Sequence, residues 1–253
     1  MIKEVSVSDP ITCEGQPDGG RTPIIDPYDG CQFCCPYCFR FCDDTWNNDI
    51  FVNINIADLL KDKLRTWDKN ETIYIGSRCD PYMPLEEKYR LTRSCLKVLD
   101  ELQINTMITT KSDNRLIFRD IDIIKNFSAQ MTILIGITNI NQIDKGALSQ
   151  NIQTANELSD NGVTVWAFIT PVLPYIMDVE EIISALSPNI KMIFLDKLRI
   201  FNPVGAKKMA DFIERQYPNF MEKYNKIINE KDEDYFNELV SKYSDNDRIK
   251  ILF

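Results

Sequence analysis

Short apolar segments alternate with amphipathic segments along most of this chain, and this alternation restricts the folds open to it. The segments typical of buried strands are residues 24–25, 72–76, 106–110, 131–138, 163–170 and 192–195. Between them lie segments with a helical period, such as the one that places Ile56, Leu60 and Leu64 on one face. Strands that alternate with helices pair in parallel through right-handed crossovers. Six such units are too few to close an eight-stranded barrel, so we expect an α/β fold, an open, partial (β/α)6 TIM-like barrel.

The pattern changes after residue 213, where the chain becomes more polar. Two amphipathic helices are predicted there, and residues 248–253 could form an edge strand. We therefore expect two units. Residues 1–213 would form the partial barrel, and residues 214–253 would form a C-terminal helical extension packed on it.

Polar residues follow several of the predicted strands. They are Ser77, Arg78, Cys79 and Asp80 after the second strand, then Lys111, Thr138, Thr170 and Asp196 after later ones. The carboxyl ends of parallel strands meet at one edge of a sheet, which is where such folds place their chemistry. The sequence therefore predicts a single active site at this edge.

The cysteines are concentrated in one short loop. Five of the chain's eight cysteines fall between Cys31 and Cys42, and Cys31, Cys35 and Cys38 have the spacing CxxxCxxC. Thiolates are the usual ligands of iron–sulfur clusters. Three of them on one loop can hold three irons of a four-iron cluster and leave the fourth iron open for chemistry. Cys34 and Cys42 are additional to this set.

Three other uses of these cysteines stay open. A structural zinc site could use the CxxC pairs, but it usually needs a second pair farther along the chain, and there is no histidine. A disulfide framework is typical of secreted chains. A closed, ferredoxin-like cluster uses other spacings. A non-enzymatic zinc or ferredoxin-like module is thus the alternative to an enzyme.

The cysteine spacing, with the aromatic Tyr37 before the last cysteine, resembles the signature of the radical S-adenosylmethionine (radical SAM) enzymes. The flanking motifs resemble the spore-photoproduct-lyase-like branch of that superfamily. The motifs are DPYDGC (residues 26–31), DPYMPLE (80–86), YRLTR (89–93) and ITTKS (108–112). The resemblance spans roughly residues 23–199. It implies the partial barrel of the radical SAM type, with a cluster loop at residues 26–42.

The resemblance also implies the cofactors, a [4Fe-4S] cluster and S-adenosyl-L-methionine. By this resemblance Cys31, Cys35 and Cys38 bind the cluster, whereas Cys34 breaks the family spacing and is interpreted as a non-ligand. Members of the superfamily use an electron from the cluster to break a sulfur–carbon bond of S-adenosylmethionine, which releases a 5′-deoxyadenosyl radical. We expect a reducing partner such as flavodoxin or ferredoxin.

Four residues are predicted to bind S-adenosylmethionine. Tyr37 would lie near the adenine, and Lys111 would contact the carboxylate through charge-assisted hydrogen bonds. Ser77 and Thr138 are further candidates for the carboxylate and the amine. Many family members carry Gly-Gly-Glu after the second strand, where this chain has Gly-Ser-Arg at residues 76–78. The alternative for Lys111 is a solvated lysine at a strand end.

Carboxylates and arginines at the strand ends are the candidates for contact with the substrate. Asp80 and Asp196 could accept hydrogen bonds from a guanine-like edge, and Arg78 and Arg199 could face a carbonyl oxygen. The alternative is structural pairing among these same residues. Repair lyases of the branch use a cysteine as a hydrogen-atom donor, and Cys79 is the candidate here, unless it is a small buried residue. Cys79 and Asp80 are therefore the predicted catalytic residues.

Charge narrows the choice of substrate. The net charge is −9, the sequence pI is about 4.7, and lysine and arginine are scattered. Binders of nucleic acid usually carry a basic face, so a nucleic-acid substrate is disfavoured and a small molecule is favoured. Our leading hypothesis is a carbon–nitrogen lyase that converts the 7-deazaguanine base queuine to aminomethyl-deazaguanine in queuosine salvage. The alternative enzyme is a DNA repair lyase similar to spore photoproduct lyase.

Location is predicted from what the sequence does not contain. No apolar run approaches the roughly 20 residues that span a bilayer. The first residues also lack the apolar stretch of a signal peptide. We therefore expect a soluble, cytoplasmic protein with no membrane partner, in a compartment where thiols stay reduced.

Overall fold

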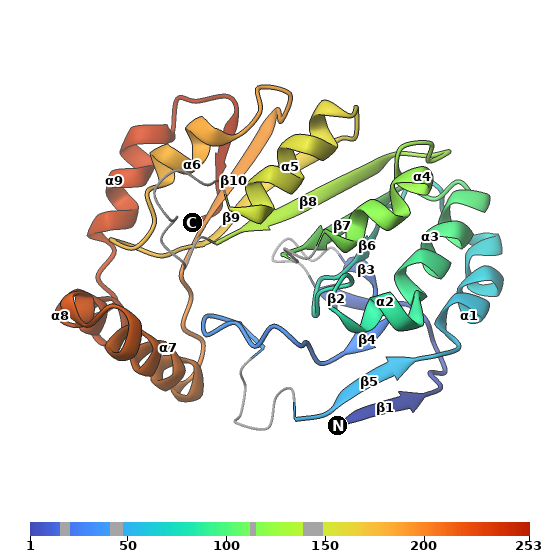
Figure 1. The fold of residues 1–253 in the computed structure, drawn as a ribbon, viewed down its shortest axis with the longest axis horizontal. Coiled ribbons are helices and arrows are strands. Elements are labelled where there is room, and N and C mark those ends of the chain that lie inside the picture. Colours follow the sequence, from blue (N-terminus) through green and yellow to red (C-terminus); the bar gives the residue numbers. More distant parts are fainter. Residues whose placement is uncertain (16–20, 41–47, 112–114, 139–148) are drawn as a thin grey trace.

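A single eight-stranded sheet organises the molecule (Figure 1). The computed structural model describes residues 1–15, 21–40, 48–111, 115–138 and 149–253. The order of the strands in the sheet is β11-β10-β9-β8-β7-β6-β3-β2. Its strands are β2 (Thr12–Gly15), β3 (Arg21–Ile25), β6 (Ile73–Ile75), β7 (Thr106–Thr110), β8 (Met131–Ile137), β9 (Val165–Val172), β10 (Met192–Lys197) and β11 (Ile249–Ile251). All neighbours pair in parallel except β2, which runs antiparallel to β3.

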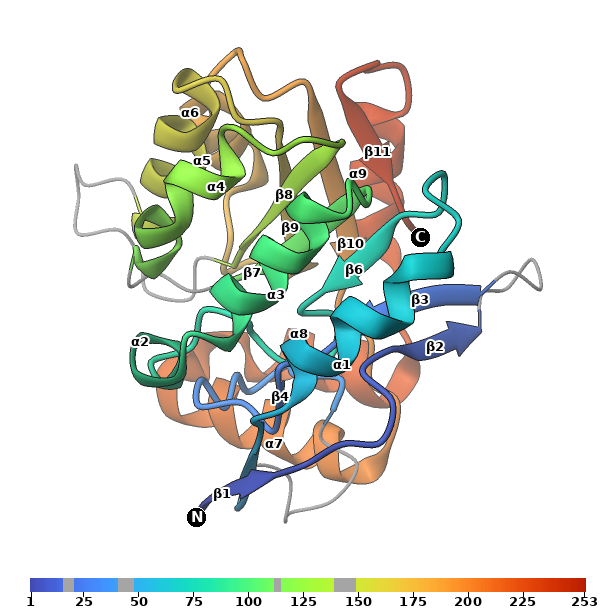
Figure 2. The same cartoon turned by 90° about the vertical axis from the view of Figure 1, so that its right-hand side faces the viewer.

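Helices cover one face of this sheet. They are α1 (Ile56–Lys63), α3 (Leu91–Glu101), α4 (Ile121–Ile124), α5 (Gln150–Asp160) and α6 (Val179–Ala185). Figure 2 looks onto several of these helices, with the strands behind them. Along β9 the alternate residues Val165, Ala167 and Ile169 are buried, as expected for the strand face that packs against helices.

Shorter elements complete the chain. A small sheet with the order β1-β5-β4 is formed by β1 (Ile2–Val5), β5 (Ile50–Asn53) and β4 (Tyr28–Asp29). The short α2 (Leu85–Tyr89) precedes α3, and α7 (Pro203–Gln216), α8 (Met221–Asn225) and α9 (Asp234–Tyr243) follow β10. Helix α7 begins where Asn202 Oδ1 accepts a hydrogen bond from the Gly205 amide at 2.8 Å, with Pro203 in the favoured first position. Figure 1 shows α7 and α8 apart from the helices that cover the sheet.

The mixed α/β fold with a parallel sheet is confirmed, and each of the six predicted strands is present. A (β/α)6 barrel is not confirmed, because β11 adds a seventh parallel strand and the described strands do not close. The antiparallel β2 and the small sheet were not predicted, since their strands have only two to four residues. Residues 248–253 do supply the expected edge strand, β11.

One hydrophobic core extends across both predicted units. Tyr224, Phe236, Leu239 and Ile249, from the last forty residues, belong to the same buried cluster as the strands of the sheet. The division at residue 213 therefore stays a prediction, and the C-terminal residues share both the core and the sheet. Among the described residues, no helix is both long and apolar enough to cross a membrane.

Candidate active site

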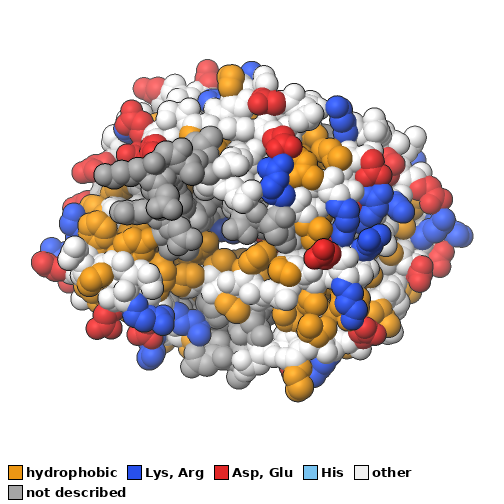
Figure 3. All heavy atoms as spheres, viewed as in Figure 1, with side chains coloured by type: hydrophobic (Ala, Val, Ile, Leu, Met, Phe, Trp, Pro, Cys, Tyr) orange, Lys and Arg blue, Asp and Glu red, His pale blue; other side chains and the backbone are white. Residues whose placement is uncertain are grey.

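A cavity of about 340 Å³ lies where the cysteine loop meets the ends of β6, β7, β9 and β10. Figure 3, which has the same view as Figure 1, shows a hollow in the middle of the molecule, and hydrophobic side chains border it. All but one of the predicted site residues line the cavity: Cys31, Cys35, Tyr37, Cys38, Ser77, Arg78, Cys79, Asp80, Lys111, Asp196 and Arg199. The structure thus brings together groups that are separated by up to 168 positions in the sequence (199 − 31 = 168).

The three spaced cysteines line this cavity, and each is half-buried. Between them, the amide of Cys38 donates a hydrogen bond to the carbonyl oxygen of Cys35 at 3.0 Å, which folds the loop into a turn. Cys34 is exposed and does not line the cavity, and its Sγ lies 3.8 Å from the Cys31 carbonyl oxygen. Cys42 lies outside the described residues. The non-ligand assignment of Cys34 stays a prediction, and its outward position is compatible with it.

Burial raises the pKa of all three thiols, that of Cys31 to about 12. The nearby Lys111 ammonium opposes this effect at Cys35 and Cys38. Without a further positive charge these groups would stay protonated, whereas metal binding ionises a thiol outright. Three thiols that face one partly water-excluded cavity fit a cluster with three protein ligands. Among the described residues no group of three or more His, Cys, Asp or Glu side chains is arranged to hold a single metal ion.

Lys111 lies on the floor of the cavity at the end of β7. Its Nζ donates a hydrogen bond to the Thr170 carbonyl oxygen and lies 4.9 Å from the centroid of the Tyr37 ring. Its side chain crosses Gly136 of β8, where an added Cβ would lie 2.4 Å from the lysine Cγ. Burial lowers the pKa of Lys111. In the described part of the chain its ammonium forms no ion pair with a carboxylate, an arrangement that favours an anionic ligand.

Asp80 positions the residues around Lys111. The buried carboxylate accepts hydrogen bonds from the Lys111 amide at 2.6 Å, from Thr110 Oγ1 at 2.7 Å and from the Tyr82 amide at 2.9 Å. These bonds join the turn after β6 to the end of β7. They leave the predicted catalytic and substrate-binding roles of Asp80 as predictions, and they assign it a structural role that the sequence did not reveal.

The turn after β6 supplies three more predicted site residues, Ser77, Arg78 and Cys79. Gly76 has φ +85°, and a Cβ there would lie 2.5 Å from the Thr109 carbonyl oxygen, so only glycine fits. Ser77 follows it at the cavity wall. Arg78 Nε lies 2.9 Å from Glu14 and 3.8 Å from Asp26, two carboxylates outside the set of predicted substrate contacts. The structural pairing considered as the alternative is present between Asp196 and Arg199.

Cys79 is buried, and its Sγ donates a hydrogen bond to the Tyr28 carbonyl oxygen at 2.7 Å. Burial raises the pKa of this thiol well above its usual value, so the sulfur keeps its hydrogen near neutral pH. A protonated thiol at the cavity wall suits hydrogen-atom donation, and equally suits a small core residue. Its catalytic role stays a prediction.

Asp196 and Arg199 form an ion pair at the mouth of the cavity. Arg199 Nη2 lies 2.8 Å from Asp196 Oδ1, and it also donates to the Leu252 carbonyl oxygen at 2.9 Å. Thr138 is the one predicted site residue that does not line the cavity. Its hydroxyl donates to the Thr170 carbonyl oxygen at 2.6 Å, the same oxygen that Lys111 contacts.

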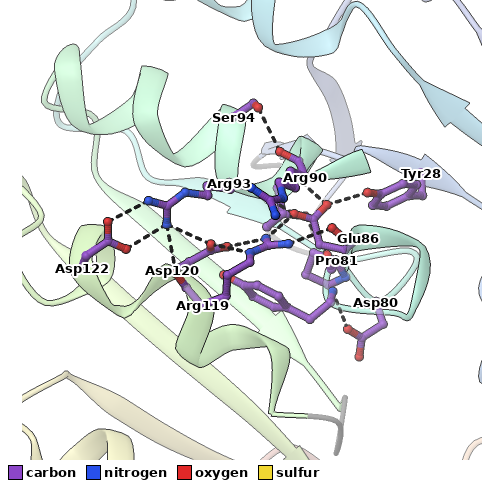
Figure 4. A network of polar contacts seen from close by, with 12 residues as sticks. Tyr28, Asp80, Pro81, Glu86, Arg90, Arg93, Ser94, Arg119, Asp120 and Asp122 are labelled. Atoms are coloured by element: carbon purple, nitrogen blue, oxygen red, sulfur yellow. Dashed lines mark hydrogen bonds and ion pairs between the residues drawn. The ribbon is translucent and has the colours of Figure 1, made fainter. Parts of the chain in front are cut away.

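The structure contains a buried ion-pair network that the sequence did not predict (Figure 4). Glu86 of α2 is fully buried, and it accepts hydrogen bonds from the Tyr28 hydroxyl at 2.5 Å and from Arg119 Nη2 at 2.6 Å. Arg119 and Arg93 both pair with the buried Asp120. The DPYMPLE and YRLTR motifs thus build this network, which ties the segment before the cysteines to α3.

Aromatic side chains around the cavity were also missed. Phe33, Phe39, Phe168 and Phe201 line it together with the polar groups. Phe168 lies two residues before Thr170 and is therefore on the same face of β9. This two-residue spacing was the signal that could have identified Phe168 from the sequence. Phe201 follows β10 in an irregular segment, where no periodicity indicates direction.

Comparison with solved structures defines the class of fold. Over the whole of this chain and 82% of the other, the fold matches a variant of spore photoproduct lyase, with a TM-score of 0.64 and 11% identity. SuiB of Streptococcus suis bound to S-adenosylmethionine matches with a TM-score of 0.57 and 16% identity, over 91% of this chain and 50% of SuiB. Both are radical SAM enzymes, and the chain shares the fold of these two proteins. No protein-family model matches the chain.

Sequence comparison then gives the family. The uncharacterized protein MJ0683 of Methanocaldococcus jannaschii is 34% identical over 220 residues, which cover 80% of this chain and 79% of MJ0683. The chain belongs to the same family as MJ0683. The uncharacterized protein Rv2578c of Mycobacterium tuberculosis is 24% identical over 182 residues, which cover 64% of this chain and 53% of Rv2578c.

Proposed function

We propose that this chain is a radical SAM enzyme whose [4Fe-4S] cluster is held by Cys31, Cys35 and Cys38. The observation that carries the proposal is that these thiols line one cavity with Lys111, a half-buried lysine whose ammonium forms no ion pair with a carboxylate of the described residues. The cluster and S-adenosylmethionine, when bound, would supply a 5′-deoxyadenosyl radical. The protein contributes orientation and the exclusion of water.

Lys111 would bind the carboxylate of S-adenosylmethionine by a charge-assisted hydrogen bond. Tyr37 would lie against the adenine, because its ring borders the cavity beside both the cysteines and Lys111. Ser77 and Thr138 are the candidates for the remaining polar groups of the cofactor. Thr138 would act indirectly, because its hydroxyl and the Lys111 ammonium both donate hydrogen bonds to the Thr170 carbonyl oxygen.

For the substrate, we propose a carbon–nitrogen lyase acting on queuine, a 7-deazaguanine base. Asp196 and Arg199 at the mouth place an acceptor beside a donor, which suits a guanine-like edge. The net charge of −9 supports a substrate without a phosphate backbone. A DNA repair lyase similar to spore photoproduct lyase is the second candidate, favoured by the similarity of the two folds.

Anaerobic reconstitution with iron and sulfide tests the cluster, and the loop offers a matched pair of variants. Cys35→Ala removes a proposed ligand, whereas Cys34→Ala removes the neighbouring thiol, which points outside the cavity. We expect about four irons per chain in the wild type. Cys34→Ala should retain this iron and Cys35→Ala should lose most of it. Equal loss in both variants, or zinc in place of iron, would contradict the proposed ligand set.

Reductive cleavage of S-adenosylmethionine tests the enzyme class. With a strong reductant or a flavodoxin or ferredoxin, the reconstituted protein should form 5′-deoxyadenosine, and Cys35→Ala should not. The substrate is tested next, by adding either queuine or ultraviolet-irradiated DNA. Formation of aminomethyl-deazaguanine supports the queuine lyase. Repair of the irradiated DNA, with queuine left intact, favours the second candidate.

A further inference from the structure

Two exposed phenylalanine rings stand at the mouth of the cavity. The chain has 13 phenylalanines, and among those in the described residues only Phe39 and Phe201 are exposed, by 53% and 66%. Both line the cavity, and both border a smaller hollow beside it. They come from distant segments, one directly after Cys38 and the other between β10 and α7. The fold therefore gathers the two exposed phenylalanines of the described residues at one place.

This placement differs from ordinary scattered exposure. Single exposed apolar residues are common on protein surfaces and need no explanation. Here the two rings flank a cavity whose remaining walls include Phe33 and Phe168. Aromatic faces of this kind stack on planar ring systems, and a nucleobase offers such a face regardless of its identity. The mouth is therefore suited to a flat aromatic ligand.

The ion pair of Asp196 and Arg199 gives this ligand a polar edge to match. Asp196 Oδ1 takes the close contact with Arg199 Nη2 at 2.8 Å, whereas the contact that Oδ2 makes with the described residues is a long one, to Arg199 Nε at 3.5 Å. Oδ2 can therefore accept from a ring N–H or an amino group, while the guanidinium donates to a carbonyl oxygen. A purine of the guanine type presents these groups side by side.

The other cations at the mouth are already paired. Arg78 lies 2.9 Å from Glu14, and Lys197 forms an ion pair with Glu233. These pairs neutralise charge that a phosphate would need, and the chain as a whole is acidic. An uncharged free base fits this mouth better than a nucleotide or a nucleic-acid strand.

We infer that the substrate carries a free, guanine-like planar ring, which stacks on Phe39 and Phe201 and presents its polar edge to Asp196. The inference rests on the proposed function and extends it, because it assigns Phe39 and Phe201 to substrate recognition. It predicts binding without turnover, so it can be tested separately from the radical chemistry.

Binding of 7-deazaguanine to the unreduced holoprotein, saturated with S-adenosylmethionine, tests the inference by calorimetry. Phe39→Leu and Phe201→Leu keep an apolar side chain but remove the ring. Each should weaken 7-deazaguanine binding by about 5- to 100-fold, the range for loss of an aromatic ring stacked on a base. Phe201→Trp keeps an aromatic ring at this position and should bind 7-deazaguanine as tightly as the wild type. Asp196→Asn should reduce the preference for 7-deazaguanine over 7-deazaadenine by about 5-fold or more, because a neutral amide replaces the carboxylate acceptor.

Phe51→Leu is the matched control, since it makes the same change in β5, outside the cavity. Iron content and affinity for S-adenosylmethionine are measured for every variant, so failure of the proposed function would appear there first. Three results would overturn the inference with the cofactor site intact. They are no binding of 7-deazaguanine to the wild type, equal binding by the leucine variants and the wild type, or tighter binding of a single-stranded oligonucleotide than of the base. If Phe39→Leu and Phe201→Leu instead weaken the binding of S-adenosylmethionine, the two rings contact the cofactor and the inference is wrong.

Discussion

At the scale of single residues, Lys111 shows how one side chain can be poor for stability and useful for binding. Its side chain is half-buried, and its ammonium contacts a carbonyl oxygen and an aromatic ring, with no carboxylate of the described residues within ion-pair distance. Taking an ammonium out of water without a counter-charge costs free energy. A carboxylate ligand would supply that charge, so the cost is recovered when the ligand binds.

Replacing this lysine should separate stability from binding. We expect Lys111→Met to weaken binding of S-adenosylmethionine by roughly 10- to 100-fold, the loss of one charge-assisted hydrogen bond, while the melting temperature stays equal or rises. Lys197→Met is the control, because Lys197 is at the mouth but pairs with Glu233. Calorimetry of cofactor binding and a thermal melt check the two effects. Equal cofactor affinity in wild type and Lys111→Met would refute the assignment.

A second residue-scale effect concerns pH. Asp26 is largely buried, and burial raises its pKa to about 6 despite the attraction of Arg78. A raised carboxyl pKa means that protonated Asp26 stabilises the fold, fully below about pH 4, and that this contribution is lost as pH rises through 6. Asp26→Asn should therefore gain stability relative to wild type between pH 4.5 and 7.5, by up to about 3 kcal/mol. Urea unfolding followed by tryptophan fluorescence measures this, and a difference that is constant over the pH range would contradict it.

At the scale of elements, the motifs that carried the resemblance turn out to do two kinds of work. The cysteine loop and Lys111 line the cavity, as their chemistry indicated. The DPYMPLE and YRLTR motifs mainly build the Glu86 network that joins α2, α3 and the segment before the cysteines. Sequence reasoning could place these charged residues near the site but could not tell buried pairing from contact with a ligand, because both use the same side chains.

The network should be costly to break. Glu86→Gln removes the charge that faces Arg119 and should destabilise the fold by about 2–4 kcal/mol, since it leaves a buried ion pair incomplete. Glu87→Gln makes the same change at the next, exposed position and should shift stability by less than about 0.5 kcal/mol. Equilibrium unfolding in urea compares the two. Similar stabilities for both variants would show that the network contributes little.

At the scale of the whole molecule, the alternation of strands and helices predicted the parallel sheet and the edge at which the cavity lies. It failed for β2 and the small sheet, because strands of two to four residues are too short to give a periodic signal. It also failed to show that β11 brings the C-terminal residues back beside β10. Such long-range pairing depends on the whole core. The aromatic mouth was missed for the same reason, since Phe39 and Phe201 meet only in the folded chain.

The overall charge gives a further prediction at this scale. With a net charge of −9, the holoprotein should not bind undamaged duplex DNA measurably at about 150 mM salt, because few phosphates would be neutralised. Fluorescence anisotropy with a labelled duplex tests this over a range of salt concentrations. Micromolar binding that weakens steeply with salt would reveal a basic groove and strengthen the case for a repair lyase.

Gly136 has a consequence for how this family can vary. Glycine within a strand weakens the strand. Here Gly136, the next-to-last residue of β8, leaves the space that the Lys111 side chain occupies at the cavity. We therefore expect the two positions to vary together among relatives. A relative that acquires a side chain at position 136 should also have lost, shortened or rerouted the cation at position 111.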